Sequence, residues 1–285
     1  MKSVLKTLIA QSLGRLGYEV VRRPRPYQTV EPWFSHPEAI ADDAVPDGWF
    51  SNVLHMANRH YRPERLAYRR PSYGEDARVK YVCDFLDLRG KRVLELGPFE
   101  GYHSILLDKL GVGAHVAVEW KEDNYRKCLR IKAKYGLANL AVHRQDSEAL
   151  YTGRARPEFD GDFDVVFCLG VLYHLSNPAA ALEWFRRLGP CLFLGTHYIE
   201  PAALERYKRS RFIENALLSH QGRTYRGWGM RNVEAAGSGP APIGFWPYEE
   251  DLVQMLAHAG YGRIEKLGKD LHNNVPHITV LAEAG

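Results

Sequence analysis

The residues best suited to chemistry lie in the stretch RVLELGPFEGYHSILL, residues 92–107. A run typical of a buried strand carries Glu95, a turn with Gly97 and Gly101 follows, and a helical pattern begins at once. Such a turn brings backbone N–H groups and a helix N-terminus against a ligand. Glycine suits the turn because a side chain there would hold the ligand away. The stretch therefore predicts a cofactor-binding turn.

Two kinds of cofactor use such a turn, and the glycine spacing separates them. A dinucleotide fingerprint counted from Gly97 needs glycine at positions 99 and 102, where the chain has Phe99 and Tyr102. An acid, a glycine two residues later and a glycine four further on form a different pattern, which Glu95, Gly97 and Gly101 meet. The stretch resembles motif I of class I S-adenosylmethionine (SAM)-dependent methyltransferases, with Phe99 in place of the usual middle glycine. The resemblance makes SAM the expected cofactor and disfavours NAD.

Short strand patterns alternate with helical patterns over most of the chain. The predicted strands are residues 92–96, 115–119, 140–143, 163–169, 191–195, 263–267 and 277–282, and the predicted helices are 102–110, 122–135, 178–188 and 249–259. Alternation of this kind predicts a parallel sheet covered by helices on both faces. Together with the resemblance it implies an α/β fold: a doubly wound, Rossmann-like, mostly parallel seven-stranded sheet with an N-terminal helical arm and an insertion after the fifth strand.

The resemblance implies further cofactor contacts where the next strands end. It puts an acid that binds both ribose hydroxyls after the second strand, where the chain has Glu119, and a carboxylate can accept both hydrogen bonds. It puts another acid near the adenine after the third strand, and the methyl-transfer site at the end of the fourth. The expected cofactor-binding residues are Glu95, Gly97, Pro98, Phe99, Gly101, Glu119, Trp120, Asp146, Ser147, Leu169 and Gly170.

The segment GVLYHLSNP, residues 170–178, follows the fourth predicted strand. It is similar to the corresponding stretch of the tRNA wobble-uridine carboxymethyltransferase family and its relatives. A hydroxyl acceptor benefits from a general base, and His174 is the best candidate here, with a loop-holding hydrogen bond as its alternative role. Tyr173 is expected to line the pocket or to pack beside it. These two residues form the predicted catalytic pair.

The region from residue 200 to 247 interrupts the alternation. Residues 201–218 predict a helix, and the Gly-, Pro- and aromatic-rich stretch after it predicts an insertion above the carboxyl edge of the sheet, where ligands of α/β folds bind. Side chains expected to recognise a substrate are His197, Arg223, Tyr225, Arg226 and Trp228. The alternative is a packed or mobile lid.

The N-terminal part differs in composition from the rest. Residues 1–20 predict an amphipathic helix docked on the domain or on a second subunit, with peripheral membrane contact as the alternative. A Pro-rich arm follows over residues 23–50. We therefore expect an N-terminal helix, arm and cap over residues 1–75 and a methyltransferase domain over 76–285. No apolar run is long enough for a membrane span, which favours a cytoplasmic protein.

The charge balance and the cysteine spacing limit which partners, RNA or metal ions, the chain is expected to bind. The chain has 38 basic and 34 acidic residues, a near balance that argues against a large RNA-binding surface. Its four cysteines have no zinc-type spacing, so free thiols and no metal site are expected. The sequence leaves homo-oligomerisation open.

Three functions remain in contention. The first is methylation of an O or N atom of a small molecule, such as a sugar or a natural product. The second is tRNA wobble-uridine modification. The third is a non-catalytic SAM-binding partner subunit, although the retained acids Glu95, Glu119 and Asp146 argue against it.

Overall fold

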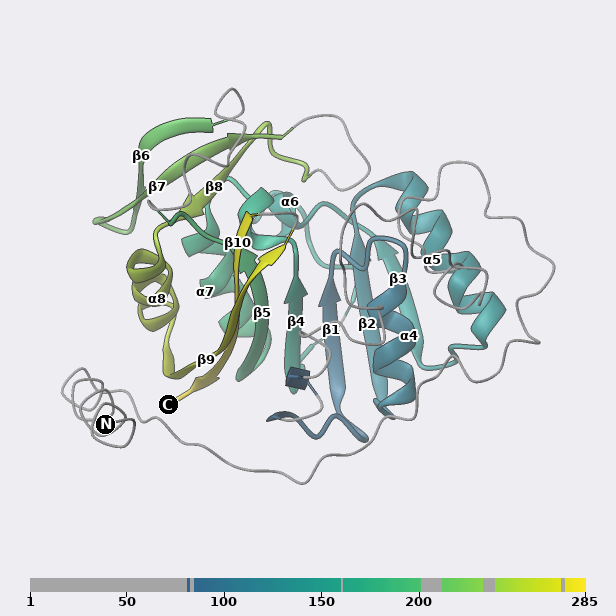
Figure 1. Cartoon of the computed structure of the whole chain (residues 1–285). Coiled ribbons are helices and arrows are strands. Elements are labelled where there is room, and N and C mark those ends of the chain that lie inside the picture. Colours follow the sequence, from purple (N-terminus) through teal and green to yellow (C-terminus); the bar gives the residue numbers. More distant parts are fainter. Residues whose placement is uncertain (1–80, 83–84, 160, 201–211, 233–238, 273–274) are drawn as a thin grey trace, which may run out of the picture.

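A computed structural model describes residues 81–82, 85–159, 161–200, 212–232, 239–272 and 275–285 of the chain (Figure 1). The predicted N-terminal helix, the Pro-rich arm and the whole of the predicted unit 1–75 lie outside these residues. Within the described part, no helix is long and apolar enough to cross a membrane.

A seven-stranded sheet forms the centre of the molecule, in the order β3-β2-β1-β4-β5-β10-β9. The first five strands in this order, β3, β2, β1, β4 and β5, are parallel to one another. Strand β10 runs antiparallel to both of its neighbours, β5 and β9. The strands are β1 (Arg92–Leu96), β2 (Ala114–Glu119), β3 (Leu140–Arg144), β4 (Val165–Leu169), β5 (Cys191–His197), β9 (Tyr261–His272) and β10 (Val275–Ala284). The predicted mostly parallel seven-stranded sheet is confirmed.

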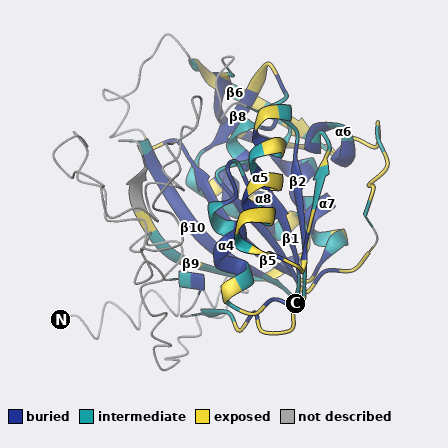
Figure 2. Ribbon diagram, turned by 90° about the vertical axis from the view of Figure 1, so that its right-hand side faces the viewer, coloured by how far each residue is buried: buried dark blue, intermediate teal, exposed yellow. Residues whose placement is uncertain are grey.

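Helices cover both faces of this sheet, because both sets of alternating strand side chains are apolar. Val93 and Phe167 pack with α4 on one face, and their chain neighbours Leu94 and Val166 pack with α7 and α8 on the other. Figure 2 shows dark blue strands beneath helices whose outer sides are exposed. The helices are α4 (Tyr102–Lys109), α5 (Glu122–Tyr135), α6 (Ser147–Tyr151), η5 (Leu172–His174), α7 (Pro178–Leu188) and α8 (Glu249–His258).

The insertion after β5 is a second, three-stranded antiparallel sheet. It consists of β6 (Phe212–His220), β7 (Arg223–Arg231) and β8 (Ile243–Pro247), in that order. The helix predicted over 201–218 is therefore wrong over residues 212–218. The physical reason is the tight turn at Gln221 and Gly222, whose φ angles of 48° and 75° suit a two-residue hairpin turn.

The small sheet lies at the carboxyl end of the central strands (Figure 1). Two backbone hydrogen bonds attach β8 to the central fold: Phe245 N–H donates to the carbonyl of Leu175, and Ile199 N–H donates to that of Pro247. The insertion is thus ordered by pairing and lies beside the edge where the cofactor turn opens.

Candidate cofactor and methyl-transfer site

The turn between β1 and α4 requires its glycines. Gly97 and Gly101 have φ angles of 62° and 85°, a region that side chains disfavour. A Cβ atom on Gly97 would lie 2.4 Å from Cγ2 of Val171, in the loop after β4, and one on Gly101 would lie 3.2 Å from Ile131 of α5. Gly101 N–H also donates to the carbonyl of Pro98, which closes the turn. The turn therefore packs tightly against the loop after β4 on one side and against α5 on the other.

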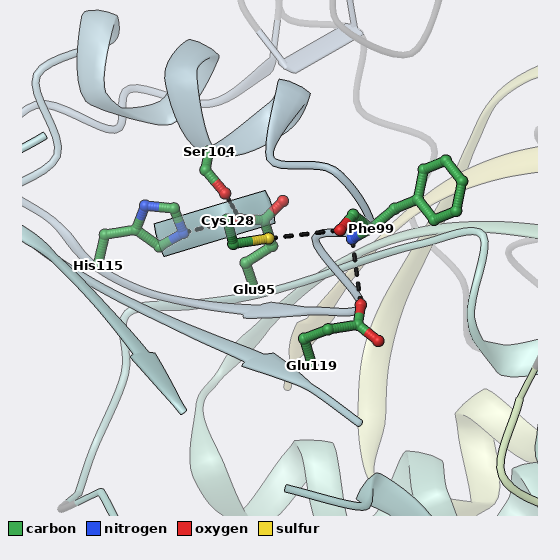
Figure 3. Close-up of polar contacts among 6 residues, drawn as sticks. All are labelled: Glu95, Phe99, Ser104, His115, Glu119 and Cys128. Atoms are coloured by element: carbon green, nitrogen blue, oxygen red, sulfur yellow. Dashed lines mark hydrogen bonds and ion pairs between the residues drawn. The ribbon is translucent and has the colours of Figure 1, made fainter. Parts of the chain in front are cut away.

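Phe99 has a left-handed backbone conformation. Glycine adopts this conformation easily, which explains why motif I usually has glycine at this position. The φ angle of Phe99 is 59°, which costs a residue with a side chain roughly 1–2 kcal/mol. Its N–H donates to Oε2 of Glu119 over 3.3 Å, and its carbonyl accepts from Sγ of Cys128 over 3.4 Å. Figure 3 shows its ring directed away from the Glu119 carboxylate. The departure from the glycine pattern therefore leaves the backbone shape of the turn in place.

Glu119 ends β2 with a carboxylate that faces the turn. The residue is only 3% exposed, and its Oε1 accepts from Lys121 N–H over 2.9 Å. Loss of water around this carboxylate raises its pKa to about 7, although the hydrogen bonds from Lys121, Phe99 and Asn124 act in the opposite direction. A buried carboxylate of this kind can accept both hydroxyls of a vicinal diol, which is the role expected of a ribose-binding acid.

Glu95 lies beneath the turn, in the layer between the sheet and α4 (Figure 3). Its Oε2 accepts from Ser104 Oγ over 2.5 Å and lies 3.0 Å from His115 Nε2, and all three residues are buried. A second carboxylate, that of Glu100, forms a 2.7 Å ion pair with Lys127 of α5. These contacts tie Glu95 to Ser104 of α4 and His115 of β2, and the direct cofactor contact expected of it stays a prediction.

The acid after β3 caps a short helix. Oδ1 of Asp146 accepts from Glu148 N–H over 2.8 Å at the start of α6, and Ser147 is buried beside it. Glu148 accepts in turn from the backbone N–H of Ser176 over 3.2 Å and from its hydroxyl. Tyr151 reaches the same loop, since its hydroxyl accepts from Asn177 N–H over 3.2 Å. The third strand is thereby tied to the loop that carries the catalytic candidates.

The remaining cofactor candidates lie at the same carboxyl edge. Leu169 is buried at the end of β4, and Gly170 has a φ angle of 83° and donates its N–H to the carbonyl of Gly195. Trp120 follows Glu119, with Nζ of Lys121 5.6 Å from its ring centroid. The structure thus brings the ends of β1, β2, β3 and β4 to one edge, although Glu95 lies below it.

His174 is held by Asn232, which directly follows β7 and was not among the residues expected at the site. The Asn232 amide nitrogen donates to the carbonyls of His174, over 3.0 Å, and Ala241, over 2.6 Å, so its Oδ1 faces His174 Nδ1 at 2.8 Å. Nδ1 must therefore carry the proton, which leaves Nε2 as an acceptor. Burial lowers the His174 pKa to about 4, so the ring is neutral near pH 7. No motif points to Asn232, because it lies 58 residues from His174 in the chain.

The Asn232 contact predicts a measurable change in the His174 ring. Replacing Asn232 by Asp puts a negative charge beside Nδ1–H, which stabilises the protonated ring and should raise the His174 pKa by roughly 1 to 3. An NMR pH titration of the histidine rings measures this, with His220 at the β6–β7 turn as the internal control. A His174 pKa equal to that of the wild type would show that Asn232 does not face Nδ1.

Tyr173 belongs to an aromatic cluster that joins η5 to the insertion. Its ring centroid lies 4.4 Å from that of His197 and 5.5 Å from that of Trp246, and the last two rings stack at 4.8 Å. His197 donates from Nδ1 to the carbonyl of Pro276 over 3.0 Å and is buried. His197 therefore lies beside Tyr173 and also has a structural contact, and its expected role toward a substrate stays a prediction.

The four candidates on β7 do not gather in one place. Tyr225 is buried and its hydroxyl lies 2.9 Å from Nδ1 of His258 on α8, and Trp228 packs in the core between Phe212 and Trp246. Arg226 forms a two-pronged contact with Asp251, through Nε at 3.1 Å and Nη2 at 2.8 Å. Arg223 is exposed. These contacts give Tyr225 and Trp228 packing roles and make Arg226 an anchor of α8, and the expected recognition of a substrate by these residues stays a prediction.

The described residues contain no group of three or more His, Cys, Asp or Glu side chains arranged to hold a metal ion. Cys128, Cys168 and Cys191 are buried free thiols.

The chain resembles known methyltransferases in both sequence and structure, although no protein-family model matches it. It is 29% identical over 128 residues to the tRNA U34 carboxymethyltransferase of Campylobacter hominis, covering 41% of this chain and 39% of that protein. It is 33% identical over 129 residues to the ubiquinone biosynthesis O-methyltransferase of Xanthomonas oryzae pv. oryzae, covering 44% of this chain and 51% of that protein. The matches thus span about two fifths to one half of these curated relatives.

A solved structure extends the similarity over more of the fold. The N-terminal domain of EvdMO1, crystallised in the presence of S-adenosylhomocysteine (SAH) and D-fucose, superposes with a TM-score of 0.56 and 26% identity, over 68% of this chain and 76% of that one. The sheet order, the glycine turn and these similarities identify the chain as a member of the class I methyltransferase superfamily, whose methyl donor is SAM.

Proposed function

We propose that this protein transfers a methyl group from SAM to an O or N atom of a small molecule, such as a sugar or a natural product. The observation that carries the proposal is the Glu119 carboxylate, which is 3% exposed and accepts the Phe99 N–H of the glycine turn. Burying a carboxylate is costly even though Phe99 and Lys121 donate hydrogen bonds to it, so its place beside the turn indicates a use. A ribose diol beside the turn provides that use.

Bound SAM supplies a methyl group activated on a sulfonium, and the chain's residues position it. Glu119 would accept the ribose hydroxyls, Asp146 would lie on the adenine side, and the loop after Gly170 would face the acceptor. His174 Nε2 would accept a hydrogen bond from the acceptor hydroxyl. Because the His174 pKa is about 4, this nitrogen would orient the hydroxyl, and the proton released as the new methyl bond forms and the sulfonium bond breaks would pass to water.

Two observations favour a small acceptor over RNA. The chain has nearly balanced charges, whereas RNA binding needs a continuous basic surface. The EvdMO1 domain, which the chain matches over 76% of that domain's length, was crystallised with D-fucose. The second candidate is a tRNA wobble-uridine enzyme, favoured by the similarity to tRNA U34 carboxymethyltransferases. A preference for carboxy-SAM together with steeply salt-dependent tRNA binding would make this candidate the better one.

The Glu119 assignment predicts a pH dependence of SAM binding. The ribose contact needs the ionised carboxylate, so binding below the Glu119 pKa of about 7 must release a proton. The affinity should therefore rise with pH between about 5 and 7, by up to about tenfold per pH unit, and level off above 7. Calorimetric titrations in a pH series measure this. Glu119→Gln should flatten the curve, and a wild-type affinity that does not vary over this range would contradict the assignment.

A further inference from the structure

A cavity of about 630 Å³ lies between the end of β5, the β6–β7 hairpin and the start of α8. Its size falls in the range of small-ligand sites. All its described lining residues come from these elements and none from β1 to β4, so the cavity is separate from the cofactor turn. Figure 1 shows these elements toward the β9–β10 end of the sheet, with α5 and β3 at the other end.

The charges around the cavity disfavour an anionic ligand. Arg226, its cation, is already neutralised by the two-pronged contact with Asp251. Of its three glutamates, only Glu249 has ion-pair partners among the described residues, namely Lys266 and Lys269. The other two, Glu200 and Glu250, are exposed carboxylates, which accept hydrogen bonds from hydroxyl groups and repel phosphates.

Aromatic and amide groups complete the lining. Tyr198 donates its hydroxyl to Glu200 over 3.2 Å, and the Tyr248 ring lies 5.7 Å from the Arg226 guanidinium. Asn215 has a left-handed φ angle of 53° in a β-bulge of β6, and bulges re-aim side chains next to functional sites. The hydroxyl acceptors and the amide suit a polyol, and Tyr248 is the half-buried ring that the apolar face of a polyol can contact. The Tyr198 ring is only 3% exposed and has Nζ of Lys269 5.5 Å from its centroid, so its hydroxyl group rather than its ring face serves the cavity.

Two residues that line the cavity are close in sequence to residues that contact the catalytic candidates. Tyr198 directly follows His197, whose ring lies 4.4 Å from that of Tyr173. Tyr248 lies two residues after Trp246, which stacks on His197. We propose that this cavity binds a neutral, polyhydroxylated, sugar-like part of the methyl acceptor. The proposal rests on the proposed function in treating this ligand as part of the acceptor.

Saturation-transfer NMR with neutral methyl glycosides of a hexose and a 6-deoxyhexose tests the cavity directly. The full chain should transfer saturation to these glycosides, and the signal should fall several-fold in Asn215→Ala and in Glu250→Gln. The matched control is Glu158→Gln, an acid with a 65% exposed side chain after β3, which should leave the signal unchanged. The 6-phosphate of the same hexose should give a weaker signal than the neutral glycoside.

Three results would overturn this assignment. The first is no saturation transfer to the neutral glycosides, and the second is a signal in the two cavity variants equal to that of the wild type. The third is a stronger signal from the sugar phosphate than from the neutral glycoside. Calorimetry with SAM on the same samples separates the two proposals. SAM binding without glycoside binding contradicts the sugar cavity alone. Glycoside binding without SAM binding supports the cavity and contradicts the proposed methyl transfer.

Discussion

Glu119→Gln should weaken SAM binding while making the protein more stable above pH 7. The loss of a charged hydrogen bond to the ribose should cost about 1–3 kcal/mol of binding free energy. The stability gain follows from the carboxylate's pKa, which is raised from 4.5 to about 7 on folding. The folded state then binds more protons than the unfolded state between these values, so the wild type loses stability as pH rises through that window.

The wild-type deficit is fully present above pH 7 and amounts to roughly 3 kcal/mol. The neutral glutamine avoids it, so the variant's free energy of unfolding should exceed that of the wild type by about 1–3 kcal/mol at pH 8, with the difference fading toward pH 5. Urea unfolding at the two pH values measures this, with Glu158→Gln as the control. A variant that is less stable than the wild type at pH 8 would show that Glu119 is a structural acid.

Gly97→Ala should be strongly destabilising and should abolish tight SAM binding. Its φ angle of 62° disfavours any side chain, and the new Cβ atom would lie 2.4 Å from Cγ2 of Val171. The backbone strain costs about 1–2 kcal/mol and the overpacking about 1–3 kcal/mol. Thermal and urea unfolding measure the sum, and calorimetry measures the loss of SAM affinity.

A second variant separates the two causes. Gly97→Ala combined with Val171→Ala should recover the overpacking part but not the backbone strain, so the two effects should be non-additive. Full additivity of the two substitutions would contradict the contact between the turn and the loop after β4.

The central sheet could be predicted from sequence because its strands and helices are local patterns with clear ends. The predicted helix over 122–135 matches α5 at both ends, and the predicted strand over 92–96 matches β1. The strands β1, β2, β4 and β5 are buried on both faces, which is typical of the inner strands of a parallel sheet. Glu119 could be selected from its place after such a strand, although its raised pKa depends on burial that only the folded chain has.

The insertion and the His174 partner could not be predicted in the same way. The pattern in β6 is mixed because most of its residues are exposed, so it lacks the apolar alternation of a half-buried strand. The Gln221–Gly222 pair was the available signal for a hairpin. Asn232 contacts His174 only because β7 pairs with β8, and β8 docks on the loop after Gly170. Contacts made through two layers of tertiary packing leave no local pattern in the sequence.

Calorimetric titration of the purified chain with SAM, and with carboxy-SAM and NAD alongside, tests whether the chain binds the methyl donor through Glu119. We expect SAM to bind at one site per chain, NAD not to bind, and Glu119→Gln to weaken SAM binding by about 1–3 kcal/mol. Absence of SAM binding, or an affinity unchanged by Glu119→Gln, would contradict this expectation.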